Sequence, residues 1–253
     1  MAKHFKQTTR KTRRLIYIVL IALIIIAAIY IIFLIKGRND TIQESNALNN
    51  VQIDESKVDI QTTERMLQVQ ELQKENSDVV GWIEIEGTNI SYPVLQGTDN
   101  SYYMTHNYKK EEAKDGSIFL DKDYDWTIPS SNLLMYGHNM GDGAMFQDLL
   151  KYEDEEFYNQ HPIIRFTTAT DDAEYEIISA FKSRVYYKSE KNVFRYYYFI
   201  NATDEEEYND FVNNAKEASF YDTGKTAEYG DQLITLSTCS YHTEDGRFAV
   251  VAR

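Results

Sequence analysis

The chain has 253 residues, of which 43% are hydrophobic and 13% aromatic, so it can build one sizeable core. Its net charge of −14 is uneven: residues 1–38 hold eight of the 26 basic residues and no acidic one, which leaves 18 basic against 40 acidic residues, a net charge of −22, beyond them. Such an acidic body argues against nucleic acid as a partner, and the single cysteine excludes an internal disulfide.

A basic segment and a long uncharged run begin the chain. Residues 1–14 hold six Lys or Arg, and residues 15–35 (LIYIVLIALIIIAAIYIIFLI) hold no charge. As a helix this run would span about 30 Å, the thickness of a bilayer core, and the basic flank favours a cytoplasmic N-terminus. A cleaved signal peptide is the alternative, but Phe33-Leu34-Ile35-Lys36 offers no small-residue cleavage site. The sequence thus predicts a single-pass membrane protein with its folded part on the extracellular face.

The next segments predict a linker and the start of a folded domain. Residues 36–60 are polar and typical of a tether, so residues 61–253 are expected to form the domain. Thr63 can begin a helix that runs to about residue 76, because Met66, Val69 and Leu72 recur at helical spacing.

From residue 79 apolar and polar residues alternate, which predicts strands. A strand pair turns near Glu86 and Gly87, and similar runs follow. A short helix is expected within residues 142–158, and a longer one after Thr203 and Glu206, which form a capping-box pattern. Eight or nine short strands predict a mainly β fold, a closed barrel or a sandwich. The later strands are expected at 117–120, 132–136, 163–167, 174–182, 193–200, 232–238 and 247–251.

The only cysteine, Cys239, ends a strand and precedes a polar loop, SYHTEDG. A thiol nucleophile needs access, a base or cation that favours the thiolate, and a donor for the oxyanion. Position alone leaves two interpretations open, a nucleophile and a structural thiol.

Among the five histidines, His138 is the best partner for this thiol. It follows NLLMYG, a strand closed by glycine, so it also lies at a strand end. His106 and His161 suit surface roles. His242 forms a C-x-x-H pair with Cys239, but one thiol without a second pair is a weak metal signal. We expect no metal site and no cofactor.

Arg247 is the candidate cation. It begins the strand after the Cys239 loop, so antiparallel pairing would place both residues at the same end of the sheet. Its guanidinium could donate two hydrogen bonds to a carbonyl or an oxyanion, although an ordinary strand-edge arginine is the alternative.

These motifs together resemble those of the sortases. TLSTC (235–239) with Arg247 eight residues later is similar to the family signature TLxTC…R, and Tyr136-Gly137-His138 resembles the segment that carries the family histidine. The stretch GWIEIEGTNISYPVLQGTDNSYY, followed by GSIFLD, looks like class B. The resemblance covers about residues 60–253. It implies a closed eight-stranded β-barrel with an N-terminal helix and a helix inserted before the cysteine-bearing strand.

The resemblance also implies an activity. Cys239 would be the nucleophile, His138 the general acid/base, and Arg247 the stabiliser of substrate and oxyanion. The enzyme would cleave surface proteins after Thr in a C-terminal sorting signal similar to N-P-x-T-x, and would pass them to an amino group of peptidoglycan or of its lipid-linked precursor. Such enzymes are anchored in the membrane of Gram-positive bacteria.

Three further residues match substrate-groove positions of class B: Ser237, Tyr136 and Asn100. A packing role for Tyr136 is the alternative. No acidic constellation suggests the calcium site of class A, and Asp125-Trp126 lacks the proline of the class C lid.

Two other functions stay open. A cysteine hydrolase would use the same residues with water as the acceptor, and a surface binding module would carry the motifs without activity. Product analysis with and without an amine distinguishes the hydrolase from a transpeptidase. Replacement of Cys239 tests whether the protein is a binding module without activity.

Overall fold

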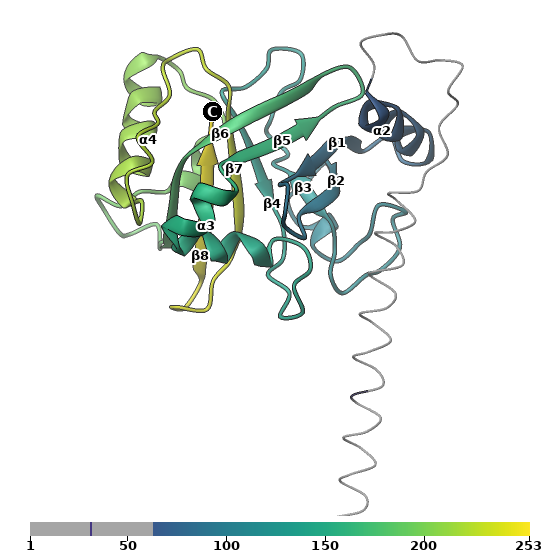
Figure 1. Cartoon of the computed structure of the whole chain (residues 1–253), viewed down its shortest axis with the longest axis horizontal. Coiled ribbons are helices and arrows are strands. Elements are labelled where there is room, and N and C mark those ends of the chain that lie inside the picture. Colours follow the sequence, from purple (N-terminus) through teal and green to yellow (C-terminus); the bar gives the residue numbers. More distant parts are fainter. Residues whose placement is uncertain (1–30, 32–62) are drawn as a thin grey trace, which may run out of the picture. The chain divides into compact units, whose positions relative to one another are not determined.

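The computed structural model describes Ile31 and residues 63–253 (Figure 1). The order of the main elements is one helix, four strands, one short helix, two strands, one long helix and two strands. Three short 3₁₀ turns, η2 (Tyr102–Met104), η3 (Gln147–Glu153) and η4 (Tyr196–Tyr198), lie between them. The main elements are α2 (Glu64–Glu75), β1 (Val79–Glu84), β2 (Ser91–Leu95), β3 (Ile118–Leu120), β4 (Asn132–Tyr136), α3 (Glu155–Gln160), β5 (Ile163–Thr167), β6 (Asp172–Arg184), α4 (Glu205–Ala218), β7 (Leu233–Cys239) and β8 (Gly246–Ala252).

The eight strands close into one barrel, in the order β1-β2-β3-β4-β7-β8-β6-β5. The β1–β5 pairing closes it, and two of the neighbour pairs, β2–β3 and β4–β7, are parallel. A parallel pair needs a crossover, and the crossover from β4 to β7 carries almost 100 residues, including β5, β6 and α4. The predicted closed eight-stranded barrel is confirmed.

Alternate residues of the central strands face two separate cores, as period-2 side chains must. Leu236 of β7 and Val250 of β8 belong to the core inside the barrel. Ala249 and Val251 of β8 point outward and pack with the apolar stripe of α4, which includes Phe211. Helix α4 therefore covers the outer face of β6 and its neighbours (Figure 1).

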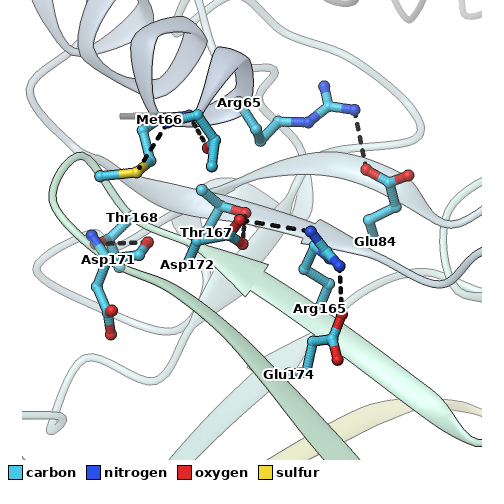
Figure 2. Close-up of polar contacts among 10 residues, drawn as sticks. Arg65, Met66, Glu84, Arg165, Thr167, Thr168, Asp171, Asp172 and Glu174 are labelled. Carbon is cyan, nitrogen blue, oxygen red and sulfur yellow. Dashed lines mark hydrogen bonds and ion pairs between the residues drawn. The ribbon is translucent and has the colours of Figure 1, made fainter. Parts of the chain in front are cut away.

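Helix α2 lies beside β1, away from α4 (Figure 1). Thr63 caps it by accepting from the Met66 amide at 3.2 Å, while the Met66 sulfur accepts from the Thr63 amide. Arg65 stacks over the Trp82 ring at 4.4 Å and bonds Glu84 at 2.9 Å. Figure 2 shows this bridge from α2 to β1 and the contact of Arg165 with Glu174 in the neighbouring β5–β6 hairpin. The expected N-terminal helix is thus present and attached to the barrel.

Three local predictions need correction. Residues 193–200 form no strand, because the barrel is closed and β6 already pairs with β5 and β8; Tyr196 and Phe199 instead pack on the outer core. The cap of α4 is Asp204 rather than Thr203, whose amide and hydroxyl bond Glu207. The single helix expected within residues 142–158 is instead η3 followed by α3.

The predicted location also needs correction. In the part of the chain that the structure describes, no helix is both long and apolar enough to cross a bilayer. This finding contradicts the single-pass localisation. Apart from Ile31, the predicted basic segment (1–14), span (15–35) and linker (36–60) lie outside the described residues.

The outer core makes a stability prediction at α4. Phe211 is 4% exposed and stacks on Phe199 with 4.1 Å between ring centroids. We expect Phe211→Ala to lower the free energy of unfolding by about 3–5 kcal/mol, because it leaves a cavity between α4 and the barrel. Asn213→Ala, on the exposed side of the same helix, should change it by less than about 0.5 kcal/mol. Urea unfolding followed by far-UV circular dichroism measures both, and similar losses for the two variants would contradict this packing.

Candidate active site

The register of three strands places four predicted residues on one face of the sheet. Tyr136 of β4 pairs with Ser237 of β7, which pairs with Ala249 of β8, and Cys239 pairs with Arg247 one row further on. Ala249 belongs to the outer core. Paired residues and residues two apart share a face. The candidate site therefore lies on the outer face of the barrel, at the end of β7, where the sequence alone indicated only a strand end.

A tight turn after β4 carries His138. A Cβ on Gly137 would lie 2.4 Å from Ile118 and 2.7 Å from Phe146, so glycine is needed for close packing here. The Gly137 amide donates to the Ser237 carbonyl at 3.1 Å, and the Thr238 hydroxyl donates to the Gly137 carbonyl at 2.7 Å. These bonds attach the histidine turn to the cysteine strand.

A second segment, the turn after β2, holds the imidazole ring of His138. Its Nε2 lies 2.7 Å from the carbonyl oxygen of Met104, in the turn after β2. Because a carbonyl can only accept, this contact requires the hydrogen on Nε2. In the neutral ring Nδ1 is then the basic nitrogen, and in the imidazolium both nitrogens carry hydrogen.

Cys239 is a free, half-buried thiol at the last position of β7. Its carbonyl oxygen accepts a hydrogen bond of 3.0 Å from the Asn139 side-chain amide. Asn139 immediately follows His138, so this bond joins the histidine turn to the cysteine itself. The thiol therefore has both access to solvent and a fixed backbone.

Arg247 lies across the strand pair from Cys239, with donors to spare. Its Nη1 donates to the Gly246 carbonyl at 3.0 Å, and over the described residues no carboxylate forms an ion pair with it. The β7–β8 turn is tight, because a Cβ on Gly246 would lie 2.1 Å from the Ser240 carbonyl oxygen. The guanidinium can therefore offer hydrogen bonds to an oxygen held above the pair.

All six residues singled out from the sequence line one pocket, with a volume of about 270 Å³. Sequence reasoning missed Met104, Val185, Tyr196 and Tyr197, because they come from turns and loops whose position only the folded barrel fixes. The pocket is lined by Asn100, Met104, Phe119, Tyr136, Gly137, His138, Val185, Tyr196, Tyr197, Ser237, Thr238, Cys239 and Arg247.

The floor of this pocket is built of neutral hydroxyl groups. Ser237 is 2% exposed, and its Oγ lies 2.7 Å from the hydroxyl of Tyr196, which is fully buried. Burial raises the pKa of both Tyr136 and Tyr196 well above the ordinary tyrosine value. Both phenols therefore stay protonated at neutral pH and act as hydrogen-bonding groups.

The other described histidines have local partners away from the pocket. His106 stacks on Tyr102, His161 contacts the Glu86 carbonyl, and His242 contacts the Ser240 hydroxyl at 2.9 Å. Burial lowers the pKa of His242. Within residues 63–253 no group of three or more His, Cys, Asp or Glu side chains is placed to hold a metal ion.

Comparison with known proteins identifies the family. Residues 83–253 match the model of the sortase domain. Sortase B of Listeria monocytogenes is 36% identical over 185 residues, which cover 72% of this chain and 72% of that protein. Sortase B of Staphylococcus aureus is 32% identical over 188 residues, 74% of each chain.

Solved structures give the same result. The crystal structure of sortase B from B. anthracis in complex with AAEK1 matches with a TM-score of 0.71 and 32% identity, over 86% of this chain and 97% of that one. The Staphylococcus aureus sortase B–substrate complex matches with a TM-score of 0.64 and 32% identity, over 73% of this chain and 83% of that one.

Sortases are cell-wall transpeptidases that act on proteins with sorting signals and on amines of peptidoglycan. The barrel topology, the lone thiol in the TLSTC strand and these similarities agree. The chain belongs to the sortase family as a class B member and is a cysteine transpeptidase.

Proposed function

We propose that residues 61–253 cleave a C-terminal sorting signal similar to N-P-x-T-x after its Thr and transfer the protein to an amino group of peptidoglycan or of its precursor. The observation that carries this proposal is the pairing of Cys239 with Arg247 beside the His138 turn, at one pocket. A nucleophile, a base and a cation on three adjoining elements are what acyl transfer through a thioester requires.

In the first half-reaction the Cys239 thiolate attacks the carbonyl carbon of the substrate Thr. The C–S bond forms as the C=O π bond opens, and the electron pair of that bond becomes the negative charge on the carbonyl oxygen. Arg247, with donors not engaged elsewhere, stabilises that oxygen. The His138 imidazolium then protonates the departing nitrogen, the C–N bond breaks, and a thioacyl-enzyme and a free amine-ended peptide remain.

In the second half-reaction an amino group attacks the thioester carbon. Neutral His138 takes a proton from the attacking nitrogen, and the C–S bond breaks to return the Cys239 thiolate. We infer that Nδ1 of His138 carries both proton transfers, because Nε2 is engaged with the Met104 carbonyl. The Met104 bond would then hold the ring in one orientation through the cycle.

The test of this function is product analysis with a peptide carrying N-P-x-T-x. In the presence of a peptidoglycan-type amine we expect an amide product, and Cys239→Ala should abolish both cleavage and transfer. Free acid as the only product at high amine concentration would indicate a hydrolase instead. Undiminished cleavage by Cys239→Ala would rule out the thiol mechanism.

Arg247→Lys tests whether the oxyanion needs only a positive charge or also the planar donor geometry of the guanidinium. The ammonium keeps the positive charge but loses the planar fork of donors. We expect kcat/KM to fall by about 100-fold or more, as on loss of an oxyanion donor. Arg253→Lys is the control, because Arg253 pairs with Glu176 away from the pocket, and it should change kcat/KM less than about twofold. A loss below about threefold for Arg247→Lys would remove this residue from catalysis.

Thr238→Val tests the attachment of the histidine turn to β7. Valine has nearly the shape of threonine but cannot donate to the Gly137 carbonyl. We expect a loss of about 1–3 kcal/mol in the free energy of unfolding and a fall of about 10-fold or more in kcat, because His138 is displaced. Thr238→Ser retains the hydroxyl and should keep kcat within about threefold of the parent. Equal kcat values for Thr238→Val and Thr238→Ser would show that the bond does not position His138.

A further inference from the structure

One buried carboxylate beside the pocket has no part in the proposed mechanism. Asp121 directly follows β3, and its side chain is 4% exposed. Its amide donates to the Leu134 carbonyl at 2.8 Å, which fixes its backbone against β4. A carboxylate taken out of water is costly unless hydrogen bonds replace its hydration, so its partners define what it does.

Asp121 has three donors around it, and two of them belong to pocket residues. Oδ2 accepts from Nδ2 of Asn100 at 2.8 Å and from the hydroxyl of Tyr136 at 3.0 Å. Oδ1 accepts from the backbone amide of Asp123 at 2.9 Å. Asn100 and Tyr136 line the pocket, whereas Asp121 lies behind them.

These bonds decide which of the two pocket groups is left to accept a hydrogen bond and which is left to donate one. The hydroxyl of Tyr136 uses its only hydrogen on Asp121, so its oxygen remains as an acceptor. The side chain of Asn100 cannot be reversed, because its Oδ1 already accepts from the Lys122 amide at 2.8 Å. Its second N–H, which has no partner among the described residues, remains as a donor.

We propose that Asp121 is a positioning residue that makes this wall of the pocket present one acceptor, from Tyr136, and one donor, from Asn100, to a peptide group of the substrate. A peptide unit carries one N–H and one C=O, so it can satisfy both. The substrate side of this inference rests on the proposed function, because it takes the bound ligand to be a peptide.

Asp121→Asn is the sharpest variant. An asparagine has nearly the same shape, but one of its two ends is a donor. If that end faces Asp123, two N–H groups oppose each other. If it faces the pocket wall, the hydroxyl of Tyr136 must turn to accept, and the amide of Asn100 must flip and lose its bond to Lys122. The first arrangement leaves Tyr136 and Asn100 on a neutral oxygen that accepts more weakly than a carboxylate, and the second reverses both groups. Both leave Cys239, His138 and Arg247 in place.

The experiment measures steady-state kinetics with the N-P-x-T-x peptide, together with the rate at which iodoacetamide alkylates Cys239. We expect Asp121→Asn to raise KM about tenfold or more, with kcat within about threefold and the alkylation rate within about twofold of the parent. Asp123→Asn is the matched control, because it removes one negative charge two residues away from Asp121. Among residues 63–253 the side chain of Asp123 has Lys122 as its ion-pair partner. This variant should change KM less than about twofold.

A double-variant comparison tests whether Asp121 acts through the wall. In a Tyr136→Phe, Asn100→Ala background, Asp121→Asn should cost less than about threefold in KM, because the groups that it positions are gone. The same cost in both backgrounds, or parallel losses in kcat and in alkylation rate, would overturn the proposal and indicate a role in folding alone.

A spectroscopic readout separates this proposal from the proposed function. The side-chain NH₂ signals of Asn100, assigned by their loss in Asn100→Ala, should shift in Asp121→Asn and stay in place in Asp123→Asn. If the parent enzyme does not cleave the peptide, the proposed function fails, while this shift still supports the positioning role. Unmoved signals in Asp121→Asn would reject Asp121 as the group that orients Asn100.

Discussion

The antiparallel pairing of β7 with β8 is the constraint on which the rest of the site depends. It sets Cys239 opposite Arg247, and the parallel pairing of β4 with β7 brings the histidine turn to the same edge. Register in a closed barrel is strongly specified, because a slip by one residue would turn every apolar side chain of β7 to the wrong face. Burial of Leu236 and Val250 fixes the register of β7 and β8, and this register places the thiol of Cys239 opposite the guanidinium of Arg247.

The position of the site on the outer face of the barrel follows from how that face is covered. Helix α4 and the aromatic segment before it bury most of the outer side of β6, β7 and β8. At the end of β7 the outer face forms the pocket, whose floor contains Ser237 and Tyr196. The interior of the barrel holds the main apolar core. A thiol on the outer face is therefore accessible to a ligand without loss of the core.

Sequence reasoning reached the parts of the fold that local pattern dictates. The strand candidates in the sequence placed β4, β5, β7 and β8 closely, and helical spacing placed α2 and α4. It failed at residues 193–200, where tyrosine and phenylalanine suit a strand but the closed barrel leaves no edge to pair with. It also failed to find Asp121 or Met104, because a single acidic residue after a strand, or one backbone carbonyl, carries no signal before its partners are known.

The order of residues along the chain establishes which chemistry is available: one thiol, a histidine after a glycine-closed strand, and an arginine eight residues beyond the thiol. Those motifs were enough to identify the resemblance to the family, because residue types and their spacing can be read directly from the sequence. The folded barrel is needed to show which face these groups share, which nitrogen of His138 is engaged, and which of Asn100 and Tyr136 offers a donor or an acceptor. The engaged nitrogen and the two polarities are set by hydrogen bonds between residues 15 to 34 positions apart, and the shared face by the pairing of β7 with β4 and β8. No local pattern in the chain records such contacts.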